Sequence, residues 1–73
     1  MEAEDAVIPD LDIWRSAQLL VRILDQDAPN HAALNADAML EAGDLDGYAV
    51  WRRILRAVEE LQRAEPKPGE AVH

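Results

Sequence analysis

The residue types that could perform catalysis or hold a metal are scarce in this sequence, and they are poorly spaced for either role. His31 and His73 are far apart and lack companions at the spacing of a zinc site, which needs three or four converging ligands. Ser16 is the single serine and falls inside a predicted helix without a neighbouring base. No glycine-rich phosphate-binding loop occurs. We therefore predict no metal, no cofactor and no enzymatic activity.

The segment 44–47 (DLDG) is similar to part of a calcium-binding loop, but the rest of that pattern does not fit. If Gly47 took the invariant glycine position, the twelfth position, which needs a glutamate, would fall on Arg53. The first position would fall on Ala42, which has no ligand atom in its side chain. Helix capping explains Asp44 and Asp46 instead.

Composition and charge exclude several classes of protein. Fifteen acidic residues against seven basic ones give a net charge of −8, which phosphate backbones and anionic membranes repel. Direct nucleic-acid binding and membrane binding are therefore unfavourable. No apolar stretch is long enough to span a bilayer, and the first five residues are acidic where a signal peptide would be basic. These features predict a cytoplasmic protein, and the lack of cysteine rules out disulfides.

The charge is unevenly distributed along the chain. Residues 1–50 carry eleven acids against two arginines, a net charge of −9, whereas residues 51–73 carry five bases against four acids, a net charge of +1. Arg52, Arg53 and Arg56 are the candidate basic face. These arginines could pair internally with the acidic helices. Alternatively, they form one pole of a surface that docks a protein partner, where complementary charge steers association.

Local signals divide the chain into helices. Asp10 is the expected N-cap of the first helix, since an aspartate side chain accepts bonds from first-turn amides. Pro29 is tolerated in a first turn but not in a helix interior. Gly43 can take the left-handed conformation that ends a helix, and Asp44 can cap the next one. Because the connections are short, consecutive helices should fold back on one another.

The predicted fold class is therefore all-α, a small three-helix bundle. The domain should span residues 9–64, with helices at about 10–26, 28–42 and 45–64 and flexible tails at 1–8 and 65–73.

Apolar residues follow a helical period in all three segments. In the second helix we expect a buried line formed by Ala32 or Ala33, Ala36, Met39 and Leu40. In the first helix, Leu19 and Ile23 widen the apolar surface beyond what one neighbouring helix would cover. The tryptophans at helical spacing are expected to anchor the core, or to contact a partner if exposed. The candidate apolar contact residues are Trp14, Leu19, Ile23 and Trp51.

Three stretches carry a resemblance to known proteins: 12–17 (DIWRSA), 36–44 (ADAMLEAGD) and 51–61 (WRRILRAVEEL). Together they make the chain resemble a family of small uncharacterised helical proteins from Alphaproteobacteria. The resemblance implies three short helices and a free-standing chain. It implies no activity, because none is known for that family.

Three functional hypotheses follow. The first is a non-enzymatic interaction module that binds a protein partner, including itself as a homodimer, because a core of this size is thin. The second is an acidic inhibitor that imitates nucleic acid, such as an anti-CRISPR protein. Its carboxylates would stand in for phosphates: Asp10, Asp12, Asp25, Asp27, Asp37, Glu41, Asp44 and Asp46. The third is a weak DNA binder that uses its last helix, which the net charge opposes.

Overall fold

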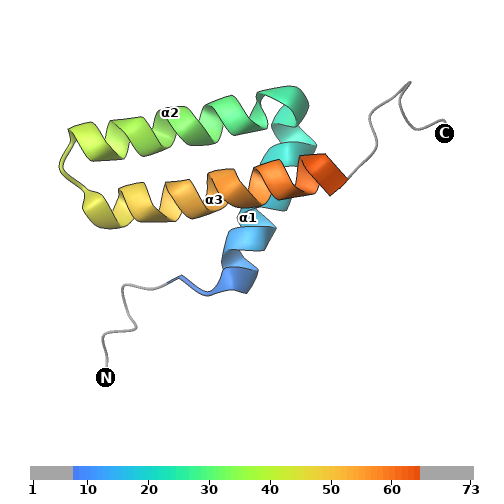
Figure 1. Cartoon of the computed structure of the whole chain (residues 1–73), viewed down its shortest axis with the longest axis horizontal. Coiled ribbons are helices and arrows are strands. Elements are labelled where there is room, and N and C mark those ends of the chain that lie inside the picture. Colours follow the sequence, from blue (N-terminus) through green and yellow to red (C-terminus); the bar gives the residue numbers. More distant parts are fainter. Residues whose placement is uncertain (1–7, 65–73) are drawn as a thin grey trace, which may run out of the picture.

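The computed structural model describes residues 8–64, and this part of the chain is helical without any strand (Figure 1). Its elements are α1 (Asp10–Leu24), the 3-10 helix η2 (Asp25–Asp27), α2 (Ala28–Glu41) and α3 (Leu45–Ala64). The predicted all-α class is confirmed. The helical residues form two uninterrupted runs, 10–41 and 45–64, because η2 joins α1 directly to α2.

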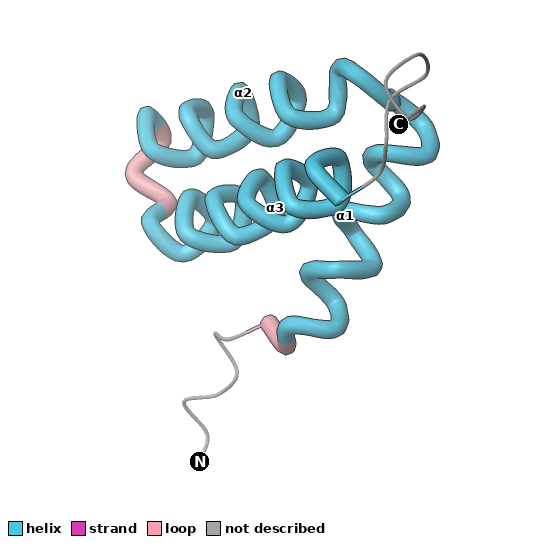
Figure 2. Tube along the Cα trace, turned by 45° about the vertical axis from the view of Figure 1, so that its right-hand side comes forward, coloured by secondary structure: helices cyan, strands magenta, loops and turns pink. Residues whose placement is uncertain are grey.

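Helices α2 and α3 lie side by side as an antiparallel hairpin, and α1 crosses α3 (Figures 1 and 2). In both views the N-terminal end of α1 lies on the side of α3 away from α2. Apart from the junction at η2, α1 packs chiefly on α3 and touches α2 very little. As a result, only one side of α1 is covered by the rest of the domain.

The turn between α2 and α3 follows the predicted capping chemistry. Gly43 has a φ of 80°, in the left-handed region. Its N–H donates to the carbonyl of Leu40 at 3.0 Å, and the N–H of Asp44 donates to the carbonyl of Met39 at 2.9 Å. This pair of bonds is a Schellman motif. The Oδ1 atom of Asp44 then accepts from the N–H of Gly47 at 2.8 Å, so one residue closes α2 and caps α3.

The junction between α1 and α2 differs from the prediction. Helix α1 ends at Leu24 rather than residue 26, because Asp25 leaves the helical region with φ 51° and ψ −114°. Its carbonyl accepts a 2.7 Å bond from Nε2 of Gln62 on α3. Pro29 lies in the first turn of α2, as predicted. Helix α2 ends at Glu41, one residue before the predicted end.

The start of α1 also corrects the prediction. Pro9 is the N-cap, and its carbonyl accepts bonds from Asp12 and Ile13. Asp10 is already inside the helix, so the prediction that it caps the helix is wrong. Ile8 was assigned to a flexible tail, but it packs against the core. The rest of the two predicted tails, residues 1–7 and 65–73, lies outside the described residues.

The core is built mainly from small side chains. Among the described residues, eight apolar side chains are buried, and five are alanines; the eight are Ile13, Ala17, Ala28, Ala32, Ala36, Ile54, Ala57 and Val58. Small residues let helices approach closely but bury little apolar area at each contact.

Leu40, which was expected in the buried line of α2, is 48% exposed. Residues four apart advance by about 400° around a helix, so each step drifts by about 40°. The line that starts at Ala28 and continues through Ala32 and Ala36 has therefore turned away from α3 by the time it reaches Leu40. Met39 is half-buried in its place.

Candidate interaction surfaces

Several of the larger apolar side chains lie on the surface. Within residues 8–64 the exposed ones are Leu11, Trp14, Leu19, Ile23, Leu34, Leu40 and Leu45. Among the larger apolar residues of this part, Val58 is completely buried, and Ile13 and Ile54 are 4% and 6% exposed. A domain with alanines inside and leucines outside has apolar surface available for contact with another molecule.

Leu19 and Ile23 form one of these surfaces, which we name the α1 strip. They are four residues apart, so they lie one turn from each other on the same face of α1. Their exposed fractions are 54% and 66%. The buried line of α1, through Ile13 and Ala17, lies on a different face and packs against α3. Because α2 hardly touches α1, no described element covers the α1 strip.

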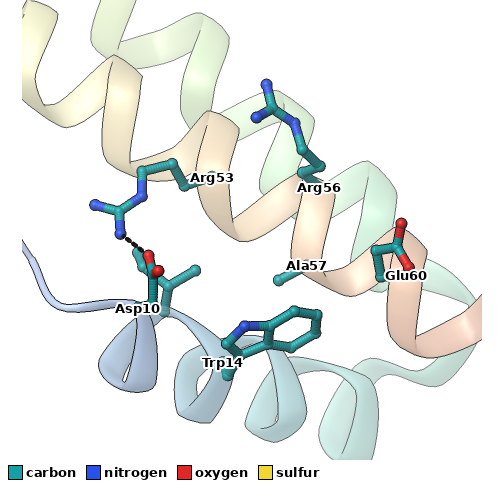
Figure 3. A pocket seen from close by; sticks show the side chains of 7 residues that line it. Asp10, Trp14, Arg53, Arg56, Ala57 and Glu60 are labelled. Atoms are coloured by element: carbon teal, nitrogen blue, oxygen red, sulfur yellow. Dashed lines mark hydrogen bonds and ion pairs between the residues drawn. The ribbon is translucent and has the colours of Figure 1, made fainter.

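A second surface is an open groove of about 360 Å³ between α1 and α3 (Figure 3). The indole of Trp14 lies below Ala57 in Figure 3, and the guanidinium of Arg53 reaches across to Asp10. We name it the Trp14 groove. Its lining residues are Asp10, Ile13 and Trp14 from α1, and Arg53, Arg56, Ala57 and Glu60 from α3.

Trp14 was expected either to anchor the core or, if exposed, to contact a partner, and it is exposed rather than part of the buried core. Its side chain is 38% exposed. The residue that faces it across the groove is Ala57, whose methyl group is too small to cover an indole. An exposed Trp beside arginines is the composition that dominates binding energy at protein interfaces.

Most of the charged side chains at the rim of the groove form ion pairs within the domain. Nη2 of Arg53 lies 2.6 Å from Oδ1 of Asp10, and Nη1 of Arg63 lies 2.9 Å from Oε2 of Glu60. For Arg56 no carboxylate of the described residues lies within 4.0 Å. The groove therefore offers an indole face next to a guanidinium that has no described ion-pair partner.

The three arginines of the predicted basic face lie within about 100° of one another around α3, but their side chains take different directions. Arg53 turns toward α1, whereas Arg52 lies over the ring of Tyr48, with its guanidinium carbon 6.0 Å from the centroid. Arg53 and Arg56 share the Trp14 groove, which Arg52 does not line. Neighbouring helical residues are about 100° apart, which separates Arg52 from Arg53.

The eight candidate acidic residues are all exposed, but they lie in separate places. Asp10 is bonded to Arg53, and Asp12 lies 4.0 Å from Arg15. Asp25 and Asp27 are at the start of α2, whereas Asp37, Glu41, Asp44 and Asp46 are in its second half or just beyond it. Helix α2 has 14 residues. At about 1.5 Å per residue, roughly 20 Å separates its two ends.

Trp51 belongs to neither surface. It is half-buried and packs against the core on the side of α3 that faces α2. There its ring and the ring of His31 form a T-shaped pair, with centroids 5.9 Å apart and planes at 75°. The four predicted apolar contact residues therefore divide among the α1 strip, the Trp14 groove and the interface of α2 with α3.

The sequence reasoning missed Ala57 and Glu60 as lining residues of the groove, and no local signal marks them. Leu34 was also missed as an exposed leucine. Its position could have been inferred, because it falls outside the apolar line of its own helix.

Within residues 8–64, no group of three or more histidines and carboxylates is placed to hold a metal ion. None of the described helices is both long enough and apolar enough to cross a membrane.

Comparison with known proteins gives no further guide, since no family model, no curated protein and no solved structure matches this chain.

Proposed function

We propose that this chain is a non-enzymatic helical interaction module of the cytoplasm that associates with a second copy of itself. In this proposal the three α-helices act as one small bundle that presents the α1 strip. The observation that carries the proposal is the exposure of Leu19 and Ile23 beside a core made mainly of alanine.

The energetic argument concerns the apolar area left outside the domain. Burying a Leu or Ile side chain fully stabilises a structure by about 1.5–3 kcal/mol. Small domains have little stability to spare, and oligomerisation is one common remedy. A second copy that covers Leu19 and Ile23 would add burial that the alanine core does not supply, and by mass action it would stabilise the folded state.

The proposal is tested by sedimentation equilibrium. We expect the wild-type chain to self-associate at micromolar concentration, and Leu19→Glu or Ile23→Glu to remain monomeric. Leu34→Glu is the matched control, because it places the same charge at another exposed apolar position, on α2. Circular dichroism would establish that all variants remain helical. A wild-type chain that is strictly monomeric at high micromolar concentration would contradict the proposal.

The rival proposal, an acidic inhibitor such as an anti-CRISPR protein, depends on carboxylates arranged like phosphates. The pairing of Asp10 with Arg53 and of Asp12 with Arg15 counts against it. Its test is binding to a CRISPR effector with and without moderate salt. DNA binding through α3 is also weakened, since Arg53 is occupied by Asp10. The absence of a gel shift with DNA at low salt would rule out this hypothesis.

A further inference from the structure

We propose that two copies pair through α1 against α1 in antiparallel orientation, with Leu19 of each copy facing Ile23 of the other. This inference rests on the proposed self-association and specifies its geometry.

The α1 strip continues along the helix as a line of exposed residues. Asp12, Ser16, Leu19 and Ile23 follow one another at intervals of four, three and four, the spacing of a single helical face. Ser16 is small enough to let another helix approach closely. The strip therefore offers a contact surface along one face of α1, with its two apolar side chains in the C-terminal half of the helix.

Charge favours antiparallel over parallel pairing. In a parallel pair, Arg15 would approach Arg15 and Asp12 would approach Asp12, so like charges would meet. In an antiparallel pair, Arg15 of one copy approaches the C-terminal end of the partner's α1, which Asp25 and Asp27 follow in the chain. Both acids are exposed. The antiparallel arrangement also aligns the helix macrodipoles favourably.

The position of the apolar residues selects one register. With the two-fold axis midway between Leu19 and Ile23, each apolar residue of one copy meets an apolar residue of the other. A shift that places Leu19 against itself would set Ile23 against Arg15. A shift in the other direction would place Ile23 against itself and set Leu19 against Asp27.

The pairing leaves the rest of the domain accessible. The Trp14 groove lies on the side of α1 that faces α3, whereas the strip lies on the side that the hairpin leaves uncovered. A single helix pair gives a small interface, so we expect a dissociation constant in the micromolar range.

The natural chain has no cysteine, which permits a direct test of the register. A Leu19→Cys chain and an Ile23→Cys chain, one with a larger tag, are oxidised separately and as an equimolar mixture. The axes of packed helices are about 8–10 Å apart, and each Cα atom lies about 2.3 Å from its axis. The Cα atoms of facing residues can therefore come within the limit of about 7 Å for a disulfide. In the proposed register only the mixture brings two cysteines face to face. We expect the mixed disulfide to exceed either homodisulfide by at least about fivefold.

The control is Leu34→Cys, an exposed position on α2 that should give background crosslinking alone and in both mixtures. If the yield of a homodisulfide equals or exceeds that of the mixed disulfide, the proposed register is wrong, although the proposed self-association is not contradicted. Sedimentation of the wild type as a dimer, without crosslinking above the Leu34→Cys background, would overturn the α1 pairing. A wild-type monomer would instead refute the proposed function itself.

Discussion

Nη2 of Arg53 donates a 2.6 Å hydrogen bond to Oδ1 of Asp10, and this bond joins α3 to the first turn of α1. The two residues are 43 positions apart in the sequence. The Asp10 side chain is 89% exposed. Solvent and salt therefore screen the pair, and its value lies more in fixing one end of the Trp14 groove than in stabilising the fold.

A double-mutant cycle measures that value. We expect Asp10→Asn, Arg53→Gln and the double variant to give a coupling free energy of at most about 1 kcal/mol, as for other exposed ion pairs. Urea unfolding, monitored by circular dichroism, gives the free energy of unfolding of the wild type and of the three variants. Exposed ion pairs contribute about 0–1 kcal/mol, so a coupling free energy above about 2 kcal/mol would contradict this prediction.

The glycine that ends α2 gives a second prediction. At a φ of 80°, a side chain at position 43 strains the backbone, although its Cβ would meet no other atom. Gly43→Ala should lower the free energy of unfolding by about 1–2 kcal/mol. Gly43→Asn is the control and should lose less, since asparagine tolerates the left-handed region. Equal losses from both variants would argue against a purely conformational cause.

The strained junction between α1 and α2 predicts a stabilising change. Asp25 has φ 51° and ψ −114°, a combination that costs a non-glycine residue about 1–3 kcal/mol. Asp25→Gly relieves this strain, but glycine also raises the conformational entropy of the unfolded chain, which offsets part of the effect. We therefore expect the free energy of unfolding to rise by about 1 kcal/mol. Asp27→Gly is the matched control. Its φ of −84° is ordinary, so that variant should lose stability. Thermal unfolding of both variants distinguishes these outcomes.

The alanine core predicts a strong dependence on side-chain size at one face of α2. Ala32 is completely buried between helices, whereas Ala38 on the same helix is exposed. Ala32→Leu should destabilise the domain by about 1–3 kcal/mol through overpacking. Ala38→Leu should leave it within about 0.5 kcal/mol of the wild type. If Ala32→Leu proved harmless, α2 and α3 would be packed less closely than the structure shows.

The sequence allowed the helix ends to be predicted where the signal is local. Gly43 and Asp44 act through bonds to residues at most five positions away, so composition alone predicts both roles. The early end of α1 could not be predicted in this way. It depends on an unusual conformation at Asp25, whose carbonyl is bonded by Gln62 from a distant part of the chain.

The surfaces were predicted less well, because burial depends on what lies opposite a side chain. Trp14 follows the helical period of a core residue, but the α3 residue that faces its indole is Ala57, which has only a methyl side chain. Leu40 continues the line of Ala36 and still falls outside the interface, since the line drifts around the helix. By contrast, the sequence pattern placed Leu19 and Ile23 outside the apolar face that one neighbouring helix would cover. Both residues are exposed in the structure.

The net charge predicts how self-association responds to salt. Each copy carries a net charge of −8, so two copies repel one another, while contact along the α1 strip is mainly apolar. Raising the ionic strength from about 0.01 M to about 0.1 M shortens the Debye length from about 30 Å to about 10 Å. The repulsion falls, whereas apolar contact is little affected, so the association constant from sedimentation equilibrium should rise. Sodium sulfate should strengthen association further than sodium chloride at equal ionic strength, because it favours apolar burial. If added salt weakens the dimer instead, attraction between the acidic and basic segments holds it together, and the α1 strip is not its main contact.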